Sequence, residues 1–144
     1  MKIDERETSR MKGDLRVRTK NFALRIIRLY LALPKSGAGQ VLGTQILKSG
    51  TSPGAHYREA QRAKSDADFV SKIEGALQEL DETVYWLELI GASRIMSEKR
   101  LQPLHTEANE LIAIFVSMVK RVKGRGRSSF PRRRRKNSIV PLPA

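Results

Sequence analysis

At 144 residues, 40% of them hydrophobic, the chain can form one hydrophobic core but hardly two, and its lack of cysteine excludes disulfides, zinc–thiolate sites and thiol catalysis. The net charge of +13 favours a polyanionic partner. An apolar run of about 18 residues does not occur, and residues 1–13 lack the apolar stretch of a secretory signal, so we expect a cytoplasmic protein with no membrane partner.

The first predicted helix covers residues 14–33 and follows an N-terminal stretch, 1–13, that we expect to be flexible. One stripe of residues recurs in steps of three and four, which is typical of one helix face. The stripe consists of Leu15, Thr19, Phe22, Ile26, Leu29 and Leu33. Pro34 disfavours helix at the residue before it, and residues 35–37 have the composition of a turn.

A second helix is predicted over residues 38–64, and it is the least regular of the four. Small residues surround Pro53 in its middle. Because proline has no amide hydrogen and crowds the carbonyl group of Ser49, we expect a kink or a break there. The small side chains would let another helix come close, so this segment is either a packing notch or a functional feature.

The third and fourth helices carry the same kind of apolar stripe. Ser65 is predicted to cap the third helix, and Gly91 to end it in a left-handed conformation, before a loop over 92–97. The stripe of the third helix is Val70, Ile73, Leu77, Leu80, Val84 and Leu87. That of the fourth is Leu101, Leu104, Ala108, Leu111, Phe115, Met118 and Val122, with Pro103 in or near the first turn. Further apolar residues widen this surface, which predicts a central helix or one shared with another subunit.

These elements predict an all-α fold, namely an antiparallel up-and-down four-helix bundle over residues 14–123. From Gly124 onward Gly, Ser, Pro and Arg dominate, so we expect residues 124–144 to form a disordered basic tail. Ten of the 28 lysines and arginines lie between Lys120 and the C-terminus, where no acid occurs, and the rest of the chain carries only +3.

The sequence contains no pattern typical of a catalytic site. Di-iron bundles need paired Glu-x-x-His motifs, but His56 with Glu59 is in reverse order and occurs alone. Glu107 and Glu110 lie near His105 but have no second set. Neither histidine belongs to a signature of serine catalysis. We therefore expect no enzyme, no cofactor and no metal site.

Charge is sorted along the predicted bundle. Residues 15–64 hold ten bases and one acid, whereas the third helix holds seven acids and one base. Two interpretations fit this sorting: the basic and acidic faces meet each other, within or between subunits, or the basic face binds phosphate groups of RNA or DNA. In the second case the candidate binding residues are Arg25, Arg28, Lys48, Arg58, Arg62, Lys64, Arg132, Arg133, Arg134 and Arg135.

Four groups of residues form a combination that is more specific than any one of them. They are Gln45-Ile46-Leu47-Lys48-Ser49-Gly50-Thr51-Ser52 with Ala55-His56-Tyr57-Arg58-Glu59-Ala60, Ser65 with Asp68-Phe69, Glu79 with Glu82, and Trp86-Leu87-Glu88-Leu89. Over residues 14–123 the chain thereby resembles the bacterial four-helix-bundle family encoded by intervening sequences of 23S ribosomal RNA genes. It departs from the family pattern at His56, where an Asn is usual, at Pro53 and Gly54, and in its arginine-rich tail.

The resemblance implies an antiparallel four-helix bundle that assembles into a homopentamer, has no known catalytic activity and is suspected to bind nucleic acid. Accessory proteins of diversity-generating retroelements share this architecture and contact a reverse transcriptase and nucleic acid. That role reaches this chain only by a further step of analogy. The departures leave the predicted bundle intact and concern the middle of the second helix and the tail.

Overall fold

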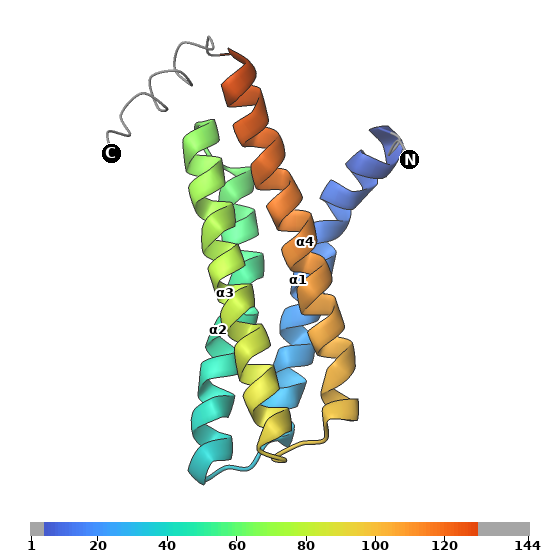
Figure 1. Cartoon of the computed structure of the whole chain (residues 1–144), viewed down its shortest axis with the longest axis vertical. Helices are drawn as coiled ribbons and strands as arrows, with labels where there is room; N and C mark the ends of the chain where they lie inside the picture. The colour runs from blue at the N-terminus through green and yellow to red at the C-terminus, as the bar shows by residue number, and fades with distance from the viewer. Residues whose placement is uncertain (1–4, 130–144) are drawn as a thin grey trace, which may run out of the picture.

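The computed structural model describes the backbone of residues 5–129 and the side-chain surroundings of residues 15–125. The chain forms four helices, α1 (Glu5–Ala32), α2 (Gly37–Gln61), α3 (Asp66–Ala92) and α4 (Glu98–Ser129). Successive helices run in opposite directions (Figure 1), and no strand occurs within residues 5–129. The predicted all-α, up-and-down four-helix bundle is therefore confirmed. In the same residues, no helix combines the length and the apolar character that crossing a membrane requires.

The first and the last helix, α1 and α4, extend beyond their predicted bounds. α1 begins at Glu5, inside the segment expected to be flexible, and α4 continues past Lys123 to Ser129. No proline precedes Pro34 or lies between Pro103 and Pro131, so nothing in these extensions blocks helical hydrogen bonding. Residues 1–4 and 130–144 lie outside the described residues, and with them the expected tail from Phe130 onward.

The core lies along the predicted stripes. All six positions of the first stripe are buried, five of them in α1 and Leu33 just after it. Ile73, Leu80, Leu111 and Phe115 of α3 and α4 have no exposed surface. Val70, Leu77 and Val84 are partly buried and pack against this core. Figure 1 shows α1 diverging from the other three helices toward its N-terminal end.

α2 passes through Pro53 without a break, so of the two expected alternatives, a kink or a break into two pieces, the break does not occur. Pro53 is buried, and so are Ser49 and Gly50 before it. Gly50 approaches Ile26 of α1, and the Ser49 hydroxyl oxygen accepts a hydrogen bond of 2.9 Å from Thr83 Oγ1 of α3. The segment is thus a packing notch, in which contacts with two helices hold a helix that local propensity disfavours.

The end of α3 differs from the prediction at Gly91. Gly91 remains helical and buried, and a Cβ atom at this position would lie 3.0 Å from Glu98 Cγ of α4. The left-handed residue is Arg94, with φ 62°, in the loop that follows. Gly91 therefore lies where α4 approaches α3 closely and does not end the helix. The predicted cap at the other end is confirmed, because Ser65 Oγ accepts a hydrogen bond from the Asp68 amide.

Candidate nucleic-acid interface

Six of the predicted nucleic-acid-binding residues lie in the part of the chain that the structure describes, and they fall into three regions. Lys48 and Arg58 lie on α2, and Arg62 caps its C-terminal end. Arg25 and Arg28 lie on α1 and line a hollow shared with α4, and Lys64 lies in the loop before α3. None of these six pairs with an acid among residues 15–125. The remaining four, Arg132, Arg133, Arg134 and Arg135, lie outside the described residues.

The α2 region presents an uncompensated positive charge. Lys48, Arg58 and the C-cap residue Arg62 are exposed, and the spacing of the three residues puts them on one side of α2 and its C-terminal end. The only acid of α2, Glu59, turns toward His56 and toward Lys72 of α3, with oxygen–nitrogen distances of 3.3 and 3.9 Å. No acid on α2 itself thus neutralises the three cations.

The second region is a hollow of about 290 Å³ between α1 and α4. Arg25 and Arg28 contribute from α1, and Arg100 contributes from the start of α4. Its apolar lining includes Leu29 and Met96, and no acidic side chain lines it. Sequence reasoning did not group Arg100 with the two α1 arginines, because it lies far away in the sequence and joins them only through the bundle.

The third region is a larger cavity of about 460 Å³ at the end of the bundle where α2 leads into α3. Lys64 lies on its rim with Arg121 and Arg125 of α4, and Tyr57 belongs to its lining. Burial raises the pKa of the Tyr57 hydroxyl above its ordinary value of 10.0, while Arg16 acts in the opposite direction. Gln61 Nε2 donates a hydrogen bond of 3.4 Å to this hydroxyl.

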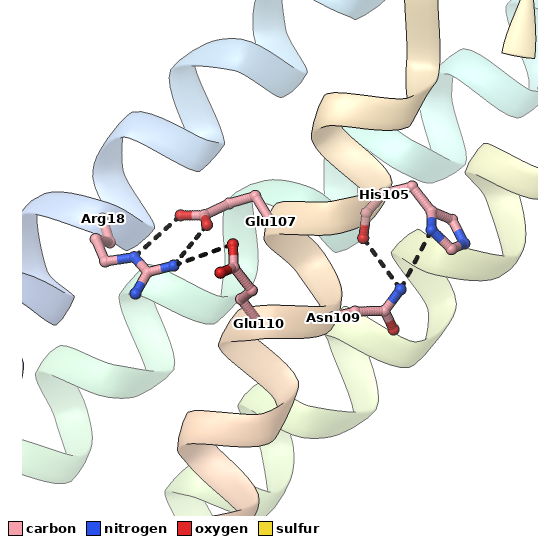
Figure 2. A network of polar contacts seen from close by, with 5 residues as sticks. All are labelled: Arg18, His105, Glu107, Asn109 and Glu110. Atoms are coloured by element: carbon pink, nitrogen blue, oxygen red, sulfur yellow. Dashed lines mark hydrogen bonds and ion pairs between the residues drawn. The ribbon is translucent and has the colours of Figure 1, made fainter. Parts of the chain in front are cut away.

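Arg18, another base of α1, forms ion pairs that connect α1 with α4. Its Nε and Nη2 atoms donate to the two carboxylate oxygens of Glu107 at 3.1 and 2.6 Å, and Nη2 lies 3.8 Å from Glu110 (Figure 2). The side chains of Arg18 and Glu107 are only 26% and 17% exposed. This two-point ion pair ties α1 to α4, so Arg18 is not part of the basic surface.

The two histidines occupy ordinary polar contacts. His56 Nδ1 is buried and lies 3.3 Å from Glu59 without hydrogen-bond geometry. His105 Nε2 lies 3.1 Å from Glu88 of α3, and the side chain of Asn109 contacts the other ring nitrogen and the carbonyl oxygen of His105 (Figure 2). Within the described residues no three acidic or histidine side chains are grouped so that they could hold a metal ion.

Sequence reasoning missed an exposed apolar stripe on α1. Val17, Leu24 and Leu31 follow one another at intervals of seven residues, and Ile27 lies beside them. All four are exposed, Leu31 to 62%. The seven-residue spacing was available in the sequence, but the stronger buried stripe of the same helix obscured it. Such a row on a solvent-facing helix is a candidate contact surface for another protein chain.

The fold and its charges thus define the class of protein. It is a four-helix bundle in which α1 and α2 form a basic half and α3 is acidic. Residues 14–117 match the family described as 23S rRNA-intervening sequence protein, and the chain belongs to this family. The resemblance stated from the sequence is therefore confirmed, and the match ends before the arginine-rich segment.

A solved structure agrees with this membership. The chain is similar to a protein of unknown function from the S23 ribosomal protein family of Bacteroides thetaiotaomicron, with 35% identity and a TM-score of 0.68. The similarity covers 76% of this chain and 97% of the other. Among curated proteins, none matches the chain.

Proposed function

We propose that the protein is a non-enzymatic, homo-oligomeric scaffold that binds RNA or DNA through the basic faces of α1 and α2 and through its arginine-rich segment. The observation that carries this proposal is the set of six exposed or partly exposed bases without an ion-pair partner among residues 15–125. Exposed cations that no acid neutralises are the groups that replace counterions along a phosphate backbone. The names of the family and of the solved relative both refer to ribosomal components, which favours testing RNA first.

The exposed stripe of α1 supports the homo-oligomeric part of the proposal. Leu24, Ile27 and Leu31 expose apolar surface next to bases such as Lys20 and Arg28. A second copy of the chain would cover this surface and bring several basic faces into one particle. Several weak phosphate-binding faces in one particle bind a polymer more tightly than one face does. The family resemblance suggests five copies.

Fluorescence anisotropy of a labelled single-stranded RNA, measured over a range of salt concentrations, tests the nucleic-acid part. We expect the Arg58→Gln/Arg62→Gln variant to bind more weakly. The slope of the logarithm of its binding constant against the logarithm of the salt concentration should become shallower by about 0.7 for each phosphate contact removed. The matched control is Lys99→Gln/Lys120→Gln, which removes two exposed charges from α4. The proposal fails if the unmodified protein does not bind at low salt, or if both double variants lose affinity equally.

A second candidate function is a protein-interaction module, for instance one that contacts a reverse transcriptase, in which the basic face never meets nucleic acid. Asp81 and Glu82 favour it, because they are exposed on α3 and form no ion pair within residues 15–125. The basic face of one copy would then meet α3 of the next. Sedimentation distinguishes the candidates, since charge-paired subunits would separate in high salt whereas subunits joined by apolar surface would not.

A further inference from the structure

We propose that the cavity between the α2–α3 connection and α4 binds one unpaired nucleotide of a single strand, with the base inside the cavity and the phosphate group on its basic rim. This inference deepens the proposed function and rests on it, because it names the form of nucleic acid that the bundle recognises. Neither the family match nor the similar structure assigns a role to this cavity.

Three parts of the chain that are far apart in sequence form the cavity. Tyr57 and Lys64 come from the end of α2 and the loop after it, Phe69 comes from the first turn of α3, and Met118 and Arg121 come from the second half of α4. Figure 1 shows this end of the bundle, where α4 passes the loop between α2 and α3. The volume of about 460 Å³ lies within the usual range of small-molecule sites.

The floor of the cavity suits a flat aromatic ring. Tyr57 is almost completely buried and packs its ring against Phe115, with 5.8 Å between the ring centroids. Phe69 and Met118 are only partly buried, so both present apolar surface to the cavity. Aromatic rings stack on nucleobases, and the thioether of methionine adapts to the edges of aromatic rings.

The rim of the cavity suits a phosphate group. Lys64, Arg121 and Arg125 outnumber the one acid of the lining, Asp66. Lys64 and Arg121 have no acidic partner in the part of the chain that the structure describes. An apolar floor under a cationic rim matches a ligand with a flat ring at one end and an anion at the other. A paired duplex hides its bases inside the helix, whereas a single strand can place one in the cavity.

Nuclear magnetic resonance of the methionine methyl groups provides a direct test, because Met118 lines this cavity and Met96 lines the hollow between α1 and α4. The full chain, labelled with carbon-13 in its methionine methyl groups, is titrated with adenosine 5′-monophosphate, ribose 5-phosphate, a single-stranded oligoadenylate and an RNA duplex. We expect the nucleotide and the single strand to shift the Met118 signal until it saturates, because the ring current of the base acts on a nearby methyl group. Ribose 5-phosphate and the duplex should leave Met118 almost unchanged, and Met96 should not respond to the nucleotide.

Two substitutions check that the shift comes from the cavity. Arg121→Gln should weaken nucleotide binding about fivefold, as expected for one exposed charge contact. Phe69→Leu keeps an apolar side chain but removes the ring, and it should weaken binding about fivefold or more. The matched control for Arg121→Gln is Lys99→Gln, an exposed base elsewhere on α4 that should bind as the unmodified protein does. Because Arg121 is exposed, its variant remains informative even if Phe69→Leu does not fold.

The outcomes separate this inference from the proposed function. Anisotropy in the same samples reports RNA binding as a whole. If the protein binds RNA but the Met118 signal does not shift, the cavity site is overturned and the proposed function still stands. A Met118 shift with nucleotide but not with the single strand would reject a strand as the source of the ligand. An equal shift with ribose 5-phosphate would show that the cavity recognises only phosphate, which also overturns the inference.

Discussion

Gly50 of α2 lies so close to Ile26 of α1 that a Cβ atom at position 50 would come within 2.6 Å of Ile26 Cγ1. Ile26 is completely buried, so its side chain cannot make room by turning outward into solvent. The absence of a side chain at Gly50 therefore sets how closely α1 and α2 approach. The small residues around Pro53, which locally disfavour a helix, thus contribute to the packing of the bundle.

Gly50→Ala should destabilise the protein although alanine favours helices. The extra methyl group overpacks the core, which costs about 1–3 kcal/mol and outweighs the gain in helix propensity of up to about 1 kcal/mol. Urea unfolding measures the difference in the free energy of unfolding. Gly124→Ala is the matched control, since a Cβ atom there meets nothing within 4 Å, and it should be neutral or stabilising. Equal stabilities of the two variants would contradict the close packing.

Breaking the ion pair between Arg18 and Glu107 should loosen α1 from α4. A double-mutant cycle with Arg18→Gln and Glu107→Gln should give a coupling energy of about 1 kcal/mol, the upper range for partly exposed pairs. The geometry favours this range because both carboxylate oxygens accept a hydrogen bond. The more exposed pair of Lys123 and Glu74 serves as control and should show weaker coupling. If Arg18 and Glu107 couple no more strongly than the control pair, their ion pair does not hold α1 against α4.

The pH dependence of stability should reveal the buried Tyr57 hydroxyl. Its pKa is raised in the folded state, so above pH 10 the unfolded chain loses this proton while the folded protein keeps it. The protonated hydroxyl therefore contributes stability that is complete below the unfolded pKa and is lost as the pH rises toward the folded pKa. Relative to Tyr57→Phe, the unmodified protein should lose stability only above about pH 10. A difference between the two proteins that stays constant from pH 8 to 11 would argue against the shift.

A charge within the exposed stripe of α1 should dissociate the proposed oligomer without unfolding the subunit. Leu31→Glu places a carboxylate on a surface that a second copy would cover, and the cost of burying it opposes assembly. Because Leu31 is 62% exposed in the single chain, the fold itself should tolerate the change. Sedimentation measures the particle mass, and circular dichroism measures the helical content.

Val41→Glu is the control for this change, because Val41 is equally exposed but lies on α2. It should leave the particle mass unchanged. Dissociation by Val41→Glu, with no effect of Leu31→Glu, would move the contact surface to α2.

The bundle could be predicted from the sequence because helical periodicity is a local property. Residues three and four positions apart meet on one face, so the stripe from Leu15 to Leu33 determines which side of α1 is buried. The cap at Ser65 followed in the same way from local hydrogen bonding. Gly91 shows where local reasoning fails, because this residue was predicted to end α3 in a left-handed conformation. In the structure it stays helical and buried, close to Glu98 of the next helix.

The candidate site depended on tertiary structure to a much greater extent. Arg18 and Arg25 look alike as bases of one predicted helix, yet Arg18 is held by Glu107, which lies 89 positions further along the chain. Arg100 joins Arg25, and Arg121 joins Lys64, only because of how the helices are rotated and aligned along one another. Periodicity along one helix determined which residues are buried. The relative rotation and alignment of different helices decided which charges pair and which line a cavity, because neither is a property of any single helix.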